Sequence, residues 1–219
     1  MCADLLSDAR LYALLLKFDE DLFARTREER CPCGGVLHSA CYCRKPRGAM
    51  VALPAGYDRR HSLCCAADGC RKRKLPPSLR YLGRKVYLGA VVVIVTAMRH
   101  GVTGARSAAL AATIGVSRRT LARWRRWWTE AFPATAFWQR ARGRLHAPVA
   151  EAELPSSLLV RIVAPDERSR LARFLDFIKP LTTAATGNWE SISMVDLRPQ
   201  SSPGDCRAEI AYGIQTERG

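Results

Sequence analysis

The spacing of apolar residues predicts that most of this chain is helical. Between residues 7 and 29, apolar side chains recur every three or four positions and so share one helix face: Leu11, Leu14, Leu15, Phe18 and Leu22. Ser7 and Asp8 stand where an N-cap is expected. Similar spacing, together with capping and breaking residues, predicts further helices at 78–99, 105–113, 117–130, 134–144 and 166–179.

The segment 86–98 is apolar on every side, which favours a buried helix over a surface helix. Its run of β-branched residues at 91–95 leaves a strand open as the alternative. The uncharged run is shorter than the roughly 20 residues that span a bilayer. The N-terminus also lacks the basic region of a signal peptide. We therefore expect a cytoplasmic protein without a membrane partner.

Residues 31–76 differ from the helical segments around them. They contain paired cysteines, glycines, prolines and short β-like runs such as 50–53, with little apolar periodicity. Such a segment needs a cross-link to fold, and a metal ion would supply one. The expected fold is mostly α with a small β zinc-ribbon and a helix-turn-helix. Its expected parts are an N-terminal helix (1–30), the zinc-ribbon module (31–76), a helical DNA-binding domain (77–147) and a partner or dimerisation segment (148–219).

The positive charge of the chain is concentrated in its centre. The formal net charge is +15, yet residues 43–147 carry 22 Lys and Arg against three acids, and both flanking segments are slightly acidic. A concentrated positive block attracts a polyanion and releases its counterions on contact. The distribution is typical of a nucleic-acid-binding protein, which in a bacterium would be associated with the nucleoid.

Nine cysteines in a reducing compartment indicate metal binding more than disulfides. Cys31-Pro-Cys33-Gly-Gly has the shape of a zinc knuckle, and a second cysteine group lies about thirty residues later. The preferred Zn²⁺ ligands are Cys31, Cys33, Cys65 and Cys70. The neighbouring candidates that can replace a ligand, or hold a second ion, are His38, Cys41, Cys43, His61 and Cys64.

The zinc is expected to be structural. A catalytic zinc needs an open position and a nearby general base, and the cysteine-rich segment contains only two carboxylates, Asp58 and Asp68.

Residues 103–128, TGARSAALAATIGVSRRTLARWRRWW, have the pattern of a helix-turn-helix. Gly115 supplies the turn, Ser117 caps the second helix, and Leu121, Trp124 and Trp128 form its inward face. The predicted base-facing residues of this helix are Arg118, Arg119, Thr120 and Arg123, beside the cap Ser117. Predicted contacts to the DNA backbone come from Arg125, Arg126, Arg71, Lys72, Arg73, Lys74, Arg84 and Lys85, of which the last six can alternatively be solvated charges.

A cysteine ribbon, the basic linker CRKRKLPPSLRYLGRKVYLGAVVV and the helix-turn-helix GVSRRTLARWRRWW follow one another in this chain. In that order they resemble the N-terminal DNA-binding halves of bacterial insertion-sequence transposases. They are similar also to small transposon-encoded zinc-ribbon proteins of proteobacteria. The resemblance covers about residues 28–145 and implies binding to the ends or regulatory DNA of a mobile element.

The chain departs from those transposases after the helix-turn-helix. Transposases of this kind carry three carboxylates on an RNase-H-like fold of more than a hundred residues, whereas only about 75 residues follow here. We therefore expect a non-enzymatic accessory or targeting subunit in transposition and DNA recombination.

Its expected partners are double-stranded DNA and a transposase or recombinase, or a second copy of itself, with no small-molecule substrate. The alternatives are an autonomous helix-turn-helix transcription regulator and an RNA-binding zinc-ribbon protein. The segment 182–219 has little periodicity, and the sequence leaves it open between an ordered partner-binding segment and a flexible tail.

Overall fold

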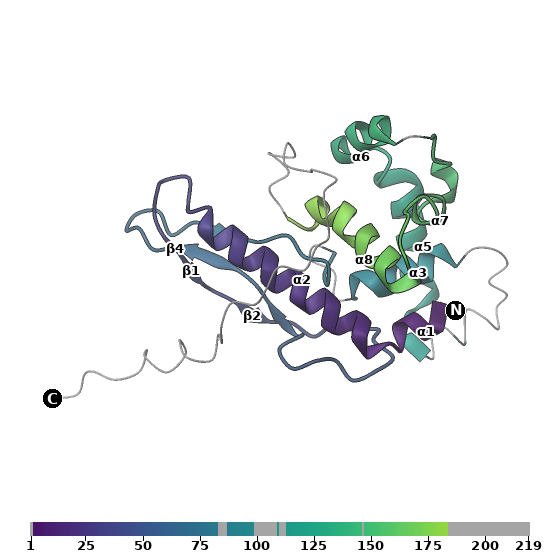
Figure 1. Ribbon diagram of the computed structural model, residues 1–219, viewed down its shortest axis with the longest axis horizontal. Helices are drawn as coiled ribbons and strands as arrows, with labels where there is room; N and C mark the ends of the chain where they lie inside the picture. Colours follow the sequence, from purple (N-terminus) through teal and green to yellow (C-terminus); the bar gives the residue numbers. More distant parts are fainter. Residues whose placement is uncertain (1, 83–86, 99–108, 110–112, 146, 184–219) are drawn as a thin grey trace. The chain divides into compact units, whose positions relative to one another are not determined.

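Helices dominate the described part of the chain, and two small antiparallel sheets accompany them (Figure 1). The computed structural model describes residues 2–82, 87–98, 109, 113–145 and 147–183. The α-helices are α1 (Cys2–Leu6), α2 (Ala9–Glu28), α3 (Gly89–Ala97), α5 (Arg118–Arg126), α6 (Ala136–Ala141), α7 (Ser156–Leu159) and α8 (Glu167–Ile178). A π-helical turn, η1 (Trp127–Ala131), continues α5, and 3-10 turns form η2 (Arg142–Arg144), η3 (Glu151–Glu153) and η4 (Lys179–Thr182).

The strands all lie in the segment that the sequence predicted to be β-like. One sheet has the order β1-β4-β5, formed by β1 (Leu37–Ser39), β4 (Leu63–Cys65) and β5 (Arg73–Lys74). In the other sheet, β2 (Tyr42–Cys43) pairs with β3 (Arg59–Arg60). The register of β1 and β4 places Leu37 opposite Cys65 and His38 opposite Cys64, so the two adjacent cysteines of β4 point to opposite faces of the sheet.

Side-chain caps set the N-terminal ends of several predicted helices. The Asp8 carboxylate accepts a hydrogen bond from the Arg10 N–H at the start of α2, and Asp166 accepts one from the Ser169 N–H at the start of α8. Each cap satisfies a backbone donor that has no partner within the helix. The predicted helices at 7–29 and 166–179 are confirmed.

The main hydrophobic core is built from the helices. Every residue of α3 from Gly89 to Thr96 is buried, as the all-round apolar pattern predicted, and the alternative of a strand at 91–95 is wrong. Aromatic rings surround Phe132, whose centroid lies 5.0 Å from that of Trp128 and 5.1 Å from that of Trp138. Because α3, η1, α6 and α8 all contribute to this core, it fixes the position of α5, which η1 directly continues.

The predicted helix from 78 begins later than expected. α3 starts at Gly89, and Ser78, which was expected to cap a helix there, is buried and donates its hydroxyl to Asp19 of α2. Arg80 and Tyr81 also make buried tertiary hydrogen bonds instead of following a helical turn. These long-range contacts override the local helix preference of the segment. Residues 83–86 lie outside the described residues.

Of the two helices predicted on either side of the turn at Gly115, the structure fully describes only the second. Most of the predicted helix at 105–113 lies outside the described residues, although 109, 113 and 114 are helical. The predicted helix at 117–130 corresponds to α5 followed by η1, and that at 134–144 corresponds to α6 followed by η2. Among the described residues, no helix has the length and apolar character required to cross a bilayer.

Candidate metal centre and candidate nucleic-acid interface

Four cysteine thiols converge at one end of the β1-β4-β5 sheet. Cys31 and Cys33 precede β1, Cys65 ends β4, and Cys70 lies in the turn between β4 and β5. All four Sγ atoms lie within 4.8 Å of one another. This is the set that the sequence favoured, and the four thiols can hold a metal ion.

The distances between these sulfur atoms fit metal coordination. Sγ of Cys31 lies 3.7 Å from Sγ of Cys70, and Sγ of Cys33 lies 3.5 Å from Sγ of Cys65. A disulfide would require about 2.05 Å. A tetrahedral ion with metal–sulfur bonds of about 2.3 Å places its ligands about 3.8 Å apart. The thiols are therefore separated by approximately one edge of a ligand tetrahedron.

Backbone N–H groups stabilise negative charge on these sulfurs. The N–H of Gly35 donates to Cys33 and, with hydrogen bonds from Cys70 and the other thiols, lowers the pKa of Cys33 to about 7. The N–H of Ala67 lowers the pKa of Cys65, but burial and the neighbouring thiols outweigh it and raise that pKa to about 12. Thiolates are the form that binds a metal.

Glycines make the tight turn around Cys33 possible. Gly34 has a φ of +84°, in the left-handed region that glycine adopts without strain. A Cβ atom on Gly35 would lie 2.6 Å from Sγ of Cys65, so only glycine leaves room for the thiols to approach each other. The Cys-Pro-Cys-Gly-Gly motif thus shapes the site through its glycines as well as its thiols.

The other predicted ligand candidates are not part of this group. Cys64, on the opposite face of β4, contacts the carbonyl oxygen of Arg71 at 3.5 Å, and His38 is its exposed neighbour on β1. Cys41 lies 3.7 Å from Nδ1 of His61, and Cys43 is exposed on β2. Within the described residues, the only group of three or more possible ligands is the four-cysteine group.

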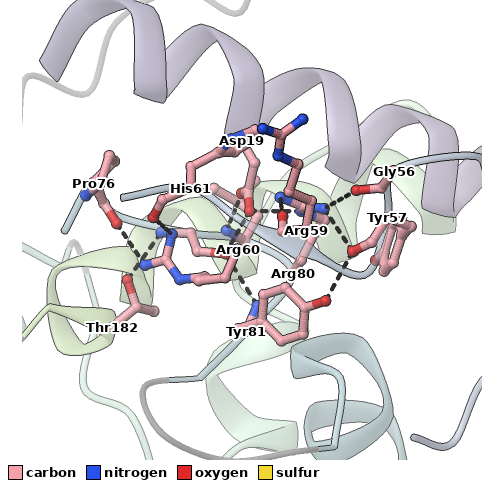
Figure 2. Close-up of polar contacts among 12 residues, drawn as sticks. Asp19, Gly56, Tyr57, Arg59, Arg60, His61, Pro76, Arg80, Tyr81 and Thr182 are labelled. Atoms are coloured by element: carbon pink, nitrogen blue, oxygen red, sulfur yellow. Dashed lines mark hydrogen bonds and ion pairs between the residues drawn. The ribbon is translucent and has the colours of Figure 1, made fainter. Parts of the chain in front are cut away.

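A buried ion pair that the sequence did not reveal fixes α2 against the strands (Figure 2). Asp19 and Arg80 are fully buried, with the Arg80 Nε donating to Asp19 Oδ2 at 2.8 Å. The Arg80 guanidinium also donates to the carbonyl oxygens of Tyr57 and Arg59. Asp19 accepts from the Leu79 N–H and the Ser78 hydroxyl. No local sequence pattern predicts this ion pair, because Asp19 and Arg80 are 61 residues apart.

The metal-ligand module and α2 also meet through a ring contact. Phe23 of α2 stacks on His61 with ring centroids 4.8 Å apart, and it packs against the small core that contains Cys31 and Cys65. Burial lowers the pKa of His61 to about 4, with smaller contributions from nearby arginines. The imidazole is consequently neutral at pH 7.

The turn before α5 is held in place by hydrogen bonds and packing. Gly115 has a φ of +67°, and its carbonyl oxygen accepts the hydroxyl of Tyr87 at 2.6 Å. The Tyr87 ring contacts Trp124 edge-on, with centroids 5.0 Å apart. Ser117 caps α5, since its hydroxyl oxygen accepts from the Thr120 N–H. These contacts give α5 a fixed starting point.

α5 has one buried face and one strongly basic exposed face. Leu121 and Trp124 are buried, and Trp128 follows on the same side in η1. The exposed side carries arginines, of which Arg126 lies 3.9 Å from Glu130 in an exposed ion pair. The predicted DNA-contacting residues of α5 that are exposed are Arg118, Arg119, Arg123 and Arg126, while Thr120 and Arg125 are half-buried.

The predicted basic linker lies on the strand side of the molecule. Lys72 and Arg73 are exposed on and before β5. Arg71 forms an exposed ion pair with Asp68, and Lys74 forms one with Glu29 of α2 at 2.6 Å. Arg84 and Lys85 lie outside the described residues.

Comparisons with models of known protein families, with curated proteins and with solved structures found no match to this chain.

Proposed function

We propose that this protein is a zinc-stabilised, sequence-specific binder of double-stranded DNA that uses α5 as its recognition helix. The observation that carries the proposal is the two-faced character of α5. One side packs into the core through Leu121 and Trp124, and the other presents exposed arginines from the first turn onward. Arginine side chains at the N-terminal end of a helix can reach guanine edges in a major groove and hydrogen-bond them in pairs.

The charge of the surrounding chain supports a polyanionic partner. Residues 43–147 carry the whole positive excess of the protein, and α5 contains five arginines and no acid. An interface of this kind gains binding energy from released counterions on any duplex, while the base contacts select a sequence.

Zinc in the four-cysteine site would act as a structural cross-link. Cys31, Cys33, Cys65 and Cys70 would hold the ion, and four thiolates leave no open position for a water or substrate. Tetrahedral sulfur coordination suits zinc, with iron as the chemical competitor. The metal would bind the turn after α2 to the β4-β5 turn and so stabilise a segment that has only a small hydrophobic core.

The order of the motifs supports a role in a mobile element. A four-cysteine site, a basic linker and a capped arginine-rich helix follow one another as in the transposase DNA-binding regions that this chain resembles. In this setting the protein would deliver a transposase or recombinase to DNA. Binding to asymmetric element ends only in the presence of such a partner supports this role, whereas binding alone to a palindrome as a dimer supports a transcription regulator.

Selection of bound sequences from a random duplex pool tests the proposal most directly. The zinc-loaded protein should enrich a defined motif that survives competitor DNA. Arg119→Ala should relax the base preference at one position and cost about 1–3 kcal/mol on the selected site. Arg25→Ala, which removes an exposed arginine from α2, is the matched control and should leave the motif intact.

Three results would overturn parts of this proposal. An unenriched pool, or equal loss for Arg119→Ala on all sequences, rules out base reading by α5. Tighter binding to single-stranded or duplex RNA than to duplex DNA favours an RNA-binding protein. Purified protein with iron or no stoichiometric metal at the four thiols rules out the structural zinc.

A further inference from the structure

A second basic segment, which the sequence did not single out, lies beside the turn that precedes α5. This segment, Arg44-Lys45-Pro46-Arg47-Gly48, follows β2 and is here named the 44–48 loop. Its last residue, Gly48, has a φ of +95°. A Cβ atom on Gly48 would lie 2.8 Å from Val91 of α3 and 3.0 Å from Ile114, which directly precedes the Gly115 turn. The loop backbone is therefore packed tightly between α3 and this turn.

Hydrogen bonds join the loop to the same turn. Arg47 pairs with Tyr87 in a parallel β-bridge, and its carbonyl oxygen accepts from the Leu88 N–H at 3.2 Å. Tyr87 in turn donates its hydroxyl to Gly115 and packs its ring on Trp124 of α5. A single residue, Tyr87, thus separates the backbone of Arg47 from the N-terminal end of α5.

The charges of the loop are available for a ligand. Lys45 and Arg47 are exposed, and within the described part of the chain neither side chain has a hydrogen bond or an ion pair. Arg44 instead makes a cation–π contact within the protein, because its guanidinium lies over the Tyr81 ring, 5.0 Å from the ring centroid. The Arg44 N–H donates to the backbone carbonyl oxygen of Asp58 at 2.8 Å.

We propose that Lys45 and Arg47 bind backbone phosphates of the duplex beside the base pairs that α5 reads. This inference rests on the proposed function of α5 and adds the partner of a second segment. A lysine ammonium and an arginine guanidinium both bind phosphate well. Because the Arg47–Gly48 backbone is fixed to the helix turn, the segment that carries both charges would not need to be ordered on binding, which lowers the entropic cost of the contact. The contacts would set the register of α5 on the duplex without reading a sequence.

The salt dependence of binding tests this proposal. Each phosphate contact contributes about 0.9 to the slope of log K against log salt concentration, so Lys45→Ala with Arg47→Ala should reduce the slope by about two. Affinity should fall by the same factor on the selected motif and on unrelated duplexes. Arg25→Ala, with one exposed charge fewer on α2, should change the slope by less than half a unit. Arg47→Lys should recover most of what Arg47→Ala loses.

Phosphate ethylation interference locates the contact. In the wild type, ethylation should interfere at phosphates flanking the base pair whose preference Arg119→Ala relaxes, and the Lys45→Ala/Arg47→Ala protein should lose that interference. An unchanged slope and unchanged interference in this variant overturn the phosphate contact while leaving base reading by α5 intact. A changed enriched motif would instead show that the loop reads bases, which also contradicts the proposal. Failure of the wild type to select any motif would be a failure of the proposed function and not of this inference alone.

Discussion

At the scale of single residues, the four-cysteine site depends on the absence of a side chain at Gly35 as well as on the four thiols. The N–H of Gly35 lowers the pKa of Cys33, and the absent Cβ lets Sγ of Cys65 lie close by. The backbone N–H of Gly35 and its lack of a Cβ atom therefore both act on the sulfur atoms of Cys33 and Cys65.

Gly35→Ala should weaken metal binding. The new Cβ would lie 2.6 Å from Sγ of Cys65 and 3.0 Å from Cβ of Ala67, so the thiols must move apart. We expect the metal affinity, measured by competition with a chelator of known affinity, to fall about 10- to 100-fold, as it does when groups supporting a metal ligand are altered. Gly143→Ala, where a Cβ meets nothing within 4 Å, is the control. Equal affinities for both variants would contradict this account of the turn.

His61 should make the protein less stable in mild acid. Its pKa in the folded state is about 4, below the usual value of about 6.5, because burial disfavours the charged ring. Between these two values the unfolded chain binds a proton that the folded chain does not. Titration of His61 therefore leaves the free energy of unfolding unchanged above pH 6.5 and lowers it as the pH decreases from 6.5 to 4. Below pH 4 His61 causes no further decrease.

Urea unfolding of the wild type and of His61→Phe, measured from pH 7 to pH 4, checks this expectation. Phenylalanine keeps the stack on Phe23 but does not titrate. The wild type should lose about 2 kcal/mol more than the variant across this range, allowing for the partial exposure of the ring. Parallel curves for the two proteins would show that His61 does not control the acid response.

At this scale the sequence predicted the thiols better than the buried polar residues. The Cys-Pro-Cys-Gly-Gly motif and the spacing to Cys65 and Cys70 are local signals, and the structure brings those four thiols together. Asp19 and Arg80 carry no such signal, since a charged residue on a helix or in a linker is usually exposed. Their burial depends on a partner far along the chain and becomes visible only in the fold.

At the scale of elements, local capping explains which helices could be predicted. Helices that begin with a side-chain cap, such as α5 at Ser117 and α8 at Asp166, start where the sequence placed them. The predicted helix from Ser78 fails even though the Ser78 hydroxyl accepts the Tyr81 N–H as a cap would. The residues that follow, 79–81, instead make tertiary hydrogen bonds to Asp19 and Tyr57. A capping serine therefore marks a helix start only when the residues after it have no competing tertiary partners.

Removal of the α5 cap should weaken both the helix and its proposed binding. Ser117→Ala leaves the Thr120 N–H without its acceptor, which costs about 1 kcal/mol in the free energy of unfolding. DNA affinity should fall on the selected site, because α5 would lose order at the end that is proposed to meet the bases. Ser117→Asn, which keeps a capping oxygen, should restore the free energy of unfolding in urea titrations. A destabilised Asn variant would mean that the hydroxyl acts other than as a cap.

At the scale of the whole molecule, the Asp19–Arg80 network holds separate parts of the chain together. It joins α2 to the segment 78–81 and, through the Arg80 guanidinium, to the backbone of Tyr57 and Arg59. The Ser78 N–H extends it to the Thr182 hydroxyl after α8. A mutation here should therefore destabilise the described unit as a whole and not one helix.

Asp19→Asn should be strongly destabilising although it preserves the shape of the side chain. It leaves the Arg80 guanidinium buried without its counter-charge, which costs about 3–5 kcal/mol when one partner of a buried ion pair is removed. Urea unfolding monitored by tryptophan fluorescence measures the loss, and the exposed neighbour Glu20→Gln should change stability by less than about 0.5 kcal/mol. A small effect of Asp19→Asn would indicate that water or another group neutralises Arg80.

The same network restricts the order in which the chain can fold during its synthesis. Asp19 enters the ribosomal tunnel long before Arg80, which lies 61 residues later in the sequence. Thr182, whose hydroxyl accepts from the Ser78 N–H, lies 104 residues after Ser78. At about 5–20 residues per second, α2 must wait several seconds for the partner of its buried carboxylate. Until then Asp19 remains hydrated, and the apolar face of α2 has no completed core to join. The network is therefore complete only when synthesis has passed α8.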